Sequence, residues 1–293
     1  MASKYRPLRP GASAATVRRA KPRAKMAHRN HMTGFADHFS EVAARYAQYR
    51  PHYPPELVDV LADRTPARGV AWDIGCGNGQ LSVALAERFD RVIAADPAQA
   101  QLEHAARHPR VEYLCATAEA SGLADASVDL AVAAQSAHWL DWPRFVPEVG
   151  RVVRPGGLVA LITYFNAELP GEAGALLAQF YRDTGPYWPS GRDHVRNRYR
   201  DLTFPWPSVE APPVLLTARW TRDELFGYVT TWSATARLVA AQGEAAVERL
   251  RQRLAAVWPD HELREVRWPL TIKRLFPTVR NVCPTNLIHR RKL

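Results

Sequence analysis

The 293-residue chain has little cysteine: three residues, far apart at Cys76, Cys115 and Cys283. The absence of any Cys-x-x-Cys pair and the odd count disfavour a zinc ribbon or a disulfide scaffold, so we expect no metal site. No apolar run approaches the roughly 18 residues of a membrane span, and residues 1–33 lack the apolar core of a secretory signal. These absences predict a soluble, cytoplasmic protein that does not associate with membranes.

Acidic residues are missing from both ends of the chain. Residues 1–36 contain nine Lys or Arg and residues 266–293 contain seven, with no Asp or Glu in either stretch. The formal net charge of +10 therefore belongs to the ends, because the residues between them hold 23 basic and 29 acidic side chains. All five lysines also fall in the end segments. Without a basic, aromatic-rich stripe across the middle, the sequence argues against a nucleic-acid partner.

The length and composition fit one principal domain. With 47% hydrophobic residues, the chain can bury an α/β core without metals or disulfides. Residues 1–33, rich in Arg and scattered with Pro, Gly and Ser, are typical of a disordered arm or an organelle transit peptide; alternatively, translation starts at Met26 or Met32. We assign residues 34–274 to the domain, divided into a core at about 34–165 and a cap with the last strands at 166–274. Residues 275–293 form a C-terminal tail of open role.

Apolar runs and helical repeats alternate along the domain. The runs have the length of buried parallel strands, and their connections are too long for hairpins, which predicts a doubly wound α/β sheet. Two further strands are expected at residues 213–220 and 265–272, with helices at 222–241 and 244–258 between them forming a cap. Residues 166–213, rich in Pro, Trp, Tyr and Arg, indicate an insertion over the site. The five apolar runs are residues 70–73, 92–95, 111–115, 128–134 and 158–163.

A glycine-rich turn follows the first apolar run. Residues 73–79 read Asp-Ile-Gly-Cys-Gly-Asn-Gly and open a helix, which is the order of a nucleotide-cofactor pocket. A dinucleotide fingerprint would place its third glycine where this chain has Gln80. Asp96 closes the next strand 21 residues after Gly75, where a carboxylate accepts the hydroxyls of a ribose. Asp73 suits a ligand with an ammonium group, so the spacing favours S-adenosylmethionine over NAD.

Five blocks in order give the chain a resemblance to a known family. They are residues 46–51, 73–79, 116–119, 134–139 and 151–157. Over about residues 35–268 the chain resembles class I S-adenosylmethionine-dependent methyltransferases, in the branch of trans-aconitate methyltransferase-like small-molecule enzymes. The resemblance implies a mostly parallel, seven-stranded, Rossmann-like methyltransferase sheet whose last two strands form an antiparallel edge, with the α-helical cap inserted between those strands. It also implies S-adenosyl-L-methionine as the cofactor.

The resemblance also implies where the cofactor lies. Asp96 would hold the ribose, Ala118 would cup the adenine, and Gln135 would lie beside the methionine moiety. Family members often have Asp where this chain has Thr117, so Glu119 is a second candidate for the adenine side; otherwise it caps the turn before Gly122. Tyr46 and Arg50 lie on a segment that folds over the cofactor in the family, although Arg50 is equally explained as a surface residue of a Pro-rich linker. The methionine half would contact Asp73, Gly75, Gly77 and Gly79.

Methyl transfer is an in-line displacement that mainly requires orientation and exclusion of water, so few catalytic residues are expected. A carboxylate acceptor needs no base, whereas a hydroxyl acceptor does, and His138 is the candidate base unless it only holds a loop. Tyr164 is the second catalytic candidate. Arg192 and Arg196 are candidate carboxylate clamps or solvated loop residues. The aromatic residues predicted to wall an acceptor pocket, or else to pack the cap, are Trp139, Trp188, Tyr228 and Trp232.

The sequence thus predicts methyl transfer from S-adenosylmethionine to a small-molecule acceptor, with carboxyl O-methylation as the favoured chemistry. An NAD(P)-dependent oxidoreductase is the first alternative, disfavoured by Gln80 and by the absence of lysine between the end segments. The second is a methyltransferase-like binding protein that has lost catalysis and uses its basic tails to hold a partner. The acceptor atom and the oligomeric state are not determined by these patterns.

Overall fold

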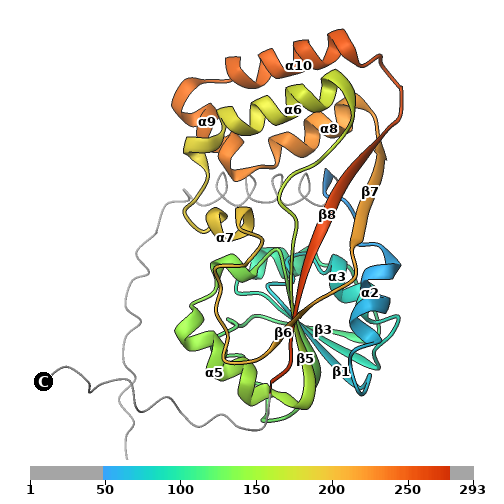
Figure 1. Ribbon diagram of the computed structural model, residues 1–293, viewed down its shortest axis with the longest axis vertical. Coiled ribbons are helices and arrows are strands. Elements are labelled where there is room, and N and C mark those ends of the chain that lie inside the picture. Colours follow the sequence, from blue (N-terminus) through green and yellow to red (C-terminus); the bar gives the residue numbers. More distant parts are fainter. Residues whose placement is uncertain (1–48, 278–293) are drawn as a thin grey trace, which may run out of the picture.

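The computed structural model describes residues 49–277, which contain a mixed sheet of eight strands in the order β3-β2-β1-β4-β5-β8-β6, with β7 also paired to β8 (Figure 1). The pairs among β1 to β5 are parallel, and every pair made by β8 is antiparallel. The predicted doubly wound, mostly parallel α/β fold is therefore confirmed. The strands are β1 Val70–Ile74, β2 Arg91–Ala95, β3 Val111–Leu114, β4 Val128–Ala134, β5 Val153–Thr163, β6 Ser208–Glu210, β7 Val214–Trp220 and β8 Arg264–Leu275.

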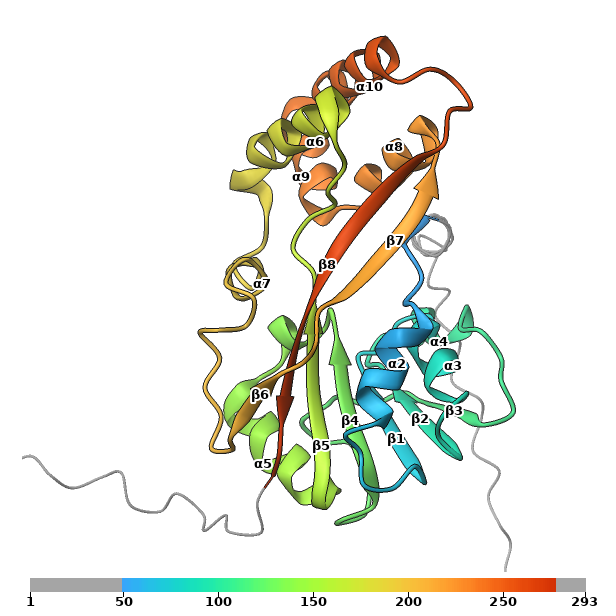
Figure 2. The same cartoon turned by 45° about the vertical axis from the view of Figure 1, so that its right-hand side comes forward.

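Helices cover both faces of the parallel part of the sheet. Alternate residues of β1 enter different apolar clusters: Ala71 belongs to the one that contains Leu57 and Leu85, and Trp72 to the one that contains Phe145. This alternation explains why the strands read as continuous apolar runs. Figure 2 shows α2 and α3 on the side opposite α5. The helices are α2 Pro55–Ala62, α3 Gln80–Leu85, α4 Gln99–Glu103 and α5 Trp142–Val152, with a 3-10 turn η1 at Ala137–Trp139.

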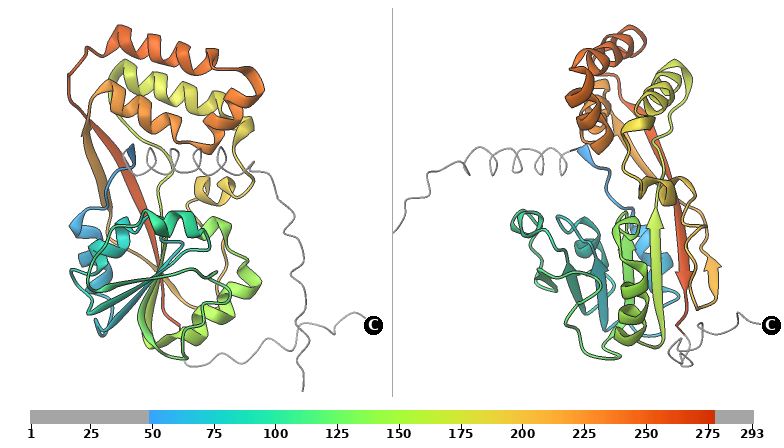
Figure 3. Two further views of the ribbon diagram at one scale, coloured as in Figure 1. Left: turned by 180° about the vertical axis from the view of Figure 1, so that it is seen from behind. Right: turned by 90° about the vertical axis from the view of Figure 1, so that its left-hand side faces the viewer.

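A helical cap stands beyond the ends of the parallel strands, joined to the sheet by the long β7–β8 ribbon (Figure 3). The last part of β8 pairs with β5 and β6, and its first part pairs with β7. Apolar residues of the cap and of the sheet belong to one continuous cluster. The cap comprises α6 Gly171–Asp183, η2 Gly185–Tyr187, α7 Arg192–Arg196, α8 Arg222–Thr230, α9 Ser233–Gln242 and α10 Ala245–Val257. No helix among residues 49–277 combines the length and the apolar character needed to cross a bilayer.

Three details differ from the sequence prediction. The sheet has eight strands where seven were predicted. The additional strand is β6, which is separate from β7 because Pro212 and Pro213 interrupt what would otherwise be one strand along β8. The single helix expected at residues 222–241 is two, α8 and α9, separated where the Trp232 side chain enters an aromatic cluster. α6 was not predicted, although its buried residues recur at helical spacing: Ala173, Leu176, Leu177, Phe180 and Tyr181.

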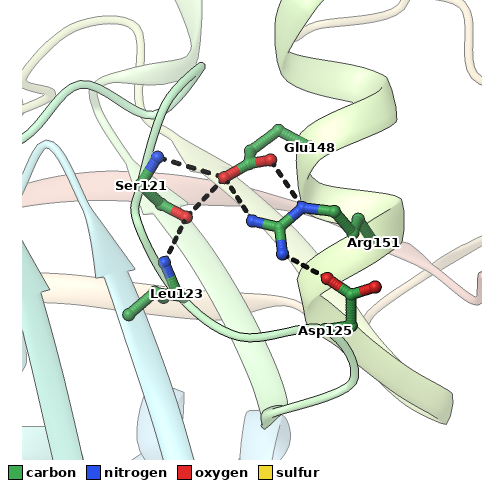
Figure 4. Close-up of polar contacts among 5 residues, drawn as sticks. All are labelled: Ser121, Leu123, Asp125, Glu148 and Arg151. Atoms are coloured by element: carbon green, nitrogen blue, oxygen red, sulfur yellow. Dashed lines mark hydrogen bonds and ion pairs between the residues drawn. The ribbon is translucent and has the colours of Figure 1, made fainter.

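A polar cluster fixes the loop that leads from β3 to β4 against α5 (Figure 4). Glu148 on α5 accepts hydrogen bonds from the backbone N–H of Ser121 at 3.1 Å and from its hydroxyl at 2.6 Å. Arg151 donates to both carboxylate oxygens of Glu148, at 2.8 and 2.9 Å, and also donates to Asp125 on the loop. These bonds lower the pKa of Glu148, the Arg151 contact most strongly.

Replacing Glu148 by Gln should destabilise the fold by about 1–3 kcal/mol at pH 7, because the variant keeps the shape but loses the charge-assisted bonds. A carboxyl whose pKa is lowered by folding stabilises the native state above its unfolded pKa, and this contribution disappears as the pH falls through the native pKa. The difference between wild type and Glu148→Gln in urea unfolding should therefore narrow at acidic pH. Glu103→Gln, at an exposed position on α4, is the control and should change little. An equal loss in both variants would contradict the assigned role.

Candidate active site

The glycine-rich turn between β1 and α3 has a backbone that only glycine adopts readily. Gly75, Gly77 and Gly79 have φ values of 64°, 55° and 80°. A Cβ on Gly75 would lie 2.6 Å from Cβ of Ser136, and one on Gly79 would lie 2.1 Å from Oη of Tyr113. The turn is also tied to β2, since the N–H of Gly75 donates to the carbonyl of Ala95 at 2.8 Å. The result is a half-buried glycine cradle at the carboxyl end of the sheet.

Asp96 braces this cradle from the end of β2. Its carboxylate accepts from the N–H of Gly77 at 2.9 Å and from the N–H of Ala98 at 2.8 Å, and the residue is 9% exposed. Each carboxylate oxygen can accept more than one hydrogen bond. Asp96 therefore keeps acceptor capacity for a ligand while it holds the turn in place.

Asp73 is the last-but-one residue of β1, next to the cradle, and is 1% exposed. Its carboxylate accepts a hydrogen bond from the Ser82 hydroxyl at 2.6 Å. Burial raises the pKa of Asp73 to about 7; the Ser82 bond opposes this rise, and the charge of Asp96 adds to it. A buried carboxylate that ionises with difficulty is stabilised by a cation, so the chemistry of this donor set suits a ligand with an ammonium group and a ribose.

Gln135 follows β4 in a left-handed conformation, with φ of 55°, which is unusual for a residue with a side chain. Its backbone N–H donates to the carbonyl of Ile162 at 2.8 Å. Its side-chain amide donates to the carbonyl of Tyr164 at 2.9 Å and accepts from the Thr163 hydroxyl at 3.1 Å. Thr163 and Tyr164, at the end of β5, thus hold Gln135 in its strained conformation. Strained residues of this kind cluster at active sites.

Two cavities adjoin. The smaller, of about 100 Å³, is bordered by Asp73 and the glycine turn, and we call it the glycine-loop cavity. The larger, of about 230 Å³, lies under the cap, and we call it the aromatic cavity. Both are lined by Arg50, Gln135 and Tyr164. A group bound in one cavity can therefore meet a group bound in the other.

The aromatic cavity is walled by rings and carries positive charge. The rings of Trp188 and Trp232 are 5.7 Å apart, and those of Tyr228 and Trp232 are 5.6 Å apart. Arg192 lies 4.5 Å over Trp188 and donates to the carbonyl of Phe165 at 2.5 Å. Arg50 lies 5.2 Å over Tyr228. Among the described residues that line this cavity there is no Asp or Glu.

His138 lines the aromatic cavity and is paired with Tyr199, which does not line it. Nδ1 of His138 lies 3.1 Å from Oη of Tyr199. Burial, followed by the charges of Arg192 and His194, lowers the pKa of His138 to about 4, so the imidazole is neutral at pH 7. Tyr199 is fully buried with φ of 56°. Sequence reasoning missed Tyr199, because nothing in an irregular insertion indicates that a left-handed residue after α7 contacts η1.

The structure brings most predicted site residues together. Ala118 is instead packed in the apolar cluster beside α5, and Glu119 accepts from the N–H of Asp141 at 2.9 Å. Arg196 is exposed and pairs with Asp193, away from both cavities, and Tyr46 lies outside the described residues. Gly79 and Asp96 adjoin the glycine-loop cavity through Gly77 rather than lining it. Residues that line one cavity or the other are Asp73, Gly75, Gly77, Arg50, Gln135, His138, Tyr164, Trp139, Trp188, Arg192, Tyr228 and Trp232.

Comparison with known proteins gives concordant matches. A family model described as a methyltransferase domain matches residues 72–161. An uncharacterized methyltransferase of Mycobacterium tuberculosis is 34% identical over 218 residues, which cover 74% of this chain and 85% of the relative. A solved structure from Anaeromyxobacter dehalogenans, described as a candidate type II methyltransferase, has a TM-score of 0.75 at 42% identity, covering 78% of this chain and 99% of its own. A malonyl-acyl-carrier-protein O-methyltransferase of Pseudescherichia vulneris is 36% identical over 131 residues, 43% of this chain and 50% of that enzyme.

Proposed function

Since this chain belongs to the class I S-adenosylmethionine-dependent methyltransferases, we propose that it methylates a small organic acid held in the aromatic cavity, at a carboxylate oxygen. The observation that carries the choice of acceptor is the lining of that cavity, which has two arginines and aromatic walls but no acidic residue among the described residues. A planar or unsaturated carboxylate matches both features.

The glycine-loop cavity fits the cofactor by its own chemistry. We propose that Asp73 binds the ammonium of the methionine half, that Asp96 accepts from the ribose, and that the glycine turn admits the ligand close to its backbone. When bound, S-adenosylmethionine supplies an electrophilic methyl group on a sulfonium. Ala118 and Glu119 remain candidates for the adenine side, and Gln135 separates the methionine half from the acceptor.

Two buried donors support an anionic acceptor. Nε1 of Trp188 and Nε of Arg192 find no hydrogen-bond acceptor within residues 49–277. Such donors are costly to leave unmet, and a carboxylate offers the acceptors they lack. The partial match to a malonyl-acyl-carrier-protein O-methyltransferase is consistent with an oxygen of an acid as the methylated atom.

A carboxylate needs no general base, which agrees with the weak basicity of His138. The main role of the protein's side chains is then to orient the acceptor. Arg192 and Arg50 would bind the acid group, Trp139, Trp188, Tyr228 and Trp232 would exclude water, and Tyr164 with Gln135 would set the approach at the junction of the cavities. Trp139, 63% exposed, stands at the rim.

The test is a panel of small mono- and dicarboxylic acids incubated with the full chain and S-adenosylmethionine, with formation of S-adenosylhomocysteine as the readout. We expect turnover with one or more acids and none with the matched primary amides, because the amide is uncharged and its oxygen is a much weaker nucleophile than a carboxylate oxygen. Calorimetry with NADH is the cofactor control and should show no binding. Turnover restricted to amines or neutral alcohols would overturn the acid assignment, and binding of NADH alone would overturn the cofactor.

A further inference from the structure

Gly227 is a glycine inside a helix whose backbone does not require one. It is buried within α8 and its φ is not positive, so alanine would suit its backbone and would favour the helix. A Cβ added at Gly227 would lie 2.5 Å from Cε1 of Tyr49 and 2.6 Å from its Cδ1 and Cζ. These are consecutive atoms of one ring, so the ring of Tyr49 lies directly against the backbone of α8. The glycine is therefore explained by Tyr49 rather than by the helix.

The next residue on each of the two segments makes a second contact. The guanidinium of Arg50 lies 5.2 Å over the ring of Tyr228, within the range of a cation–π interaction. Tyr228 is 2% exposed and is fixed in turn, because its hydroxyl accepts a hydrogen bond from Nε1 of Trp268 at 3.1 Å. Two consecutive residues of the cap thus hold two consecutive residues of the segment before α2. We call Tyr49, Arg50, Gly227 and Tyr228 the clasp.

The clasp determines where Arg50 lies. Arg50 lines both cavities and donates to the Tyr164 hydroxyl at 3.5 Å. Pro51 and Tyr53, next along the chain, line the glycine-loop cavity as well. Pro51 is buried, and a residue that precedes proline is restricted to an extended backbone. With little freedom of its own, the main chain at Arg50 must follow any displacement of Tyr49.

We infer that Tyr49 and Gly227 are positioning residues through which the cap sets the affinity of the glycine-loop cavity for S-adenosylmethionine. Neither residue lines either cavity, so both act through Arg50. Since Arg50 also lines the aromatic cavity, the same contact should set the KM for the acceptor. This acceptor half rests on the proposed function, whereas the cofactor half requires only that the glycine-loop cavity binds S-adenosylmethionine.

The contact itself is tested by a double-variant cycle in thermal unfolding of the full chain. Gly227→Ala should lower the Tm of the wild type, although alanine is the better helix former, because its methyl group displaces the Tyr49 ring. In a Tyr49→Ala background the same substitution should raise the Tm by roughly 1–4 °C. Gly185→Ala is the matched control, since a Cβ there meets no atom of residues 49–277 within 4 Å and should have the same small effect in both backgrounds. An equal effect of Gly227→Ala in both backgrounds would overturn the contact.

The positioning role is tested by calorimetry with S-adenosylhomocysteine, well below the Tm of each variant. Gly227→Ala and Tyr49→Ala should each bind it roughly 10-fold more weakly, and the double variant should bind it no more weakly than Tyr49→Ala alone. Tyr49→Phe keeps the ring and should keep wild-type affinity, and Gly185→Ala should leave the affinity unchanged. A purely structural contact would lower the Tm without moving the affinity, and that result would overturn the inference. If Gly227→Ala failed to fold, the comparison of Tyr49→Ala with Tyr49→Phe would give the same decision.

The acceptor half is read from the KM of the acid that gives turnover. This KM should rise roughly 10-fold in Gly227→Ala while kcat changes less, because the substitution weakens binding without touching a reacting group. An unchanged KM beside weakened S-adenosylhomocysteine binding would overturn the acceptor half and keep the cofactor half. If no acid gives turnover, the proposed function fails, and the clasp is judged by the affinity for S-adenosylhomocysteine alone.

Discussion

Replacing Asp73 by Asn should make the protein more stable at pH 8 and abolish tight cofactor binding. Burial raises the pKa of this carboxyl from 3.8 to about 7, so its ionisation in the native state is penalised. Stability therefore falls as the pH rises from about 4 to about 7, where the unfolded chain ionises and the native one does not. Asparagine keeps an oxygen for Ser82 and removes the penalty, so the gain at pH 8 should be about 2–4 kcal/mol.

The same substitution removes the proposed partner of the cofactor ammonium. Loss of one member of a buried charge pair costs about 2–5 kcal/mol, so S-adenosylhomocysteine should bind roughly 100-fold or more weakly. Thermal unfolding and calorimetry at pH 6 and pH 8 measure both effects. Wild-type affinity should rise between these pH values as Asp73 ionises, and the variant should lose that dependence. Asp90→Asn, at an exposed position before β2, is the control. Binding within a few-fold of wild type would remove Asp73 from the cofactor site.

The parallel half of the fold was predictable because its signals are local. β4 was expected at residues 128–134 and occupies Val128–Ala134, since a strand buried on both faces has an uninterrupted apolar run. β5 is longer than expected: Val153 already pairs with Val128, and Gly156, with φ of 80°, lies inside the strand rather than before it. The two-glycine sequence has the composition of a turn, and only the register with β4 shows otherwise.

The cap was harder to predict because distant packing decides it. Trp232 divides α8 from α9, since its ring packs with those of Phe180 and Tyr228, which lie in different helices. The glycine turn and Asp96 can be recognised from their local sequence motif. The pairing of His138 with Tyr199 cannot, because it depends on a left-handed residue 61 positions away. Single residues such as Trp188 could be proposed from the sequence as pocket walls, but the cavity is formed by elements from both parts of the chain.

Arg192 is expected to have the largest effect on the acceptor side. Arg192→Met keeps an apolar stem against Trp188 and removes the charge, so kcat/KM for the preferred acid should fall by roughly 10²–10³-fold through loss of a charge pair. Cofactor affinity should stay unchanged, since Arg192 lines only the aromatic cavity. Arg196→Met is a matched control on the same helix, because Arg196 is exposed and pairs with Asp193.

A second readout separates the charge of Arg192 from its packing. The charge of Arg192 is one cause of the low pKa of His138, after burial, so Arg192→Met should raise that pKa while Arg196→Met should not. If Arg192→Met lowered kcat/KM only by distorting the cavity, the variant would show no defined rise in the pKa of His138. Reduced turnover, a raised His138 pKa and unchanged cofactor binding together would mean that a single guanidinium both holds the acid and keeps the neighbouring imidazole neutral. Unchanged kcat/KM in Arg192→Met would instead exclude Arg192 as the acid-binding group and leave Arg50 as the remaining cation among residues 49–277 that line the aromatic cavity.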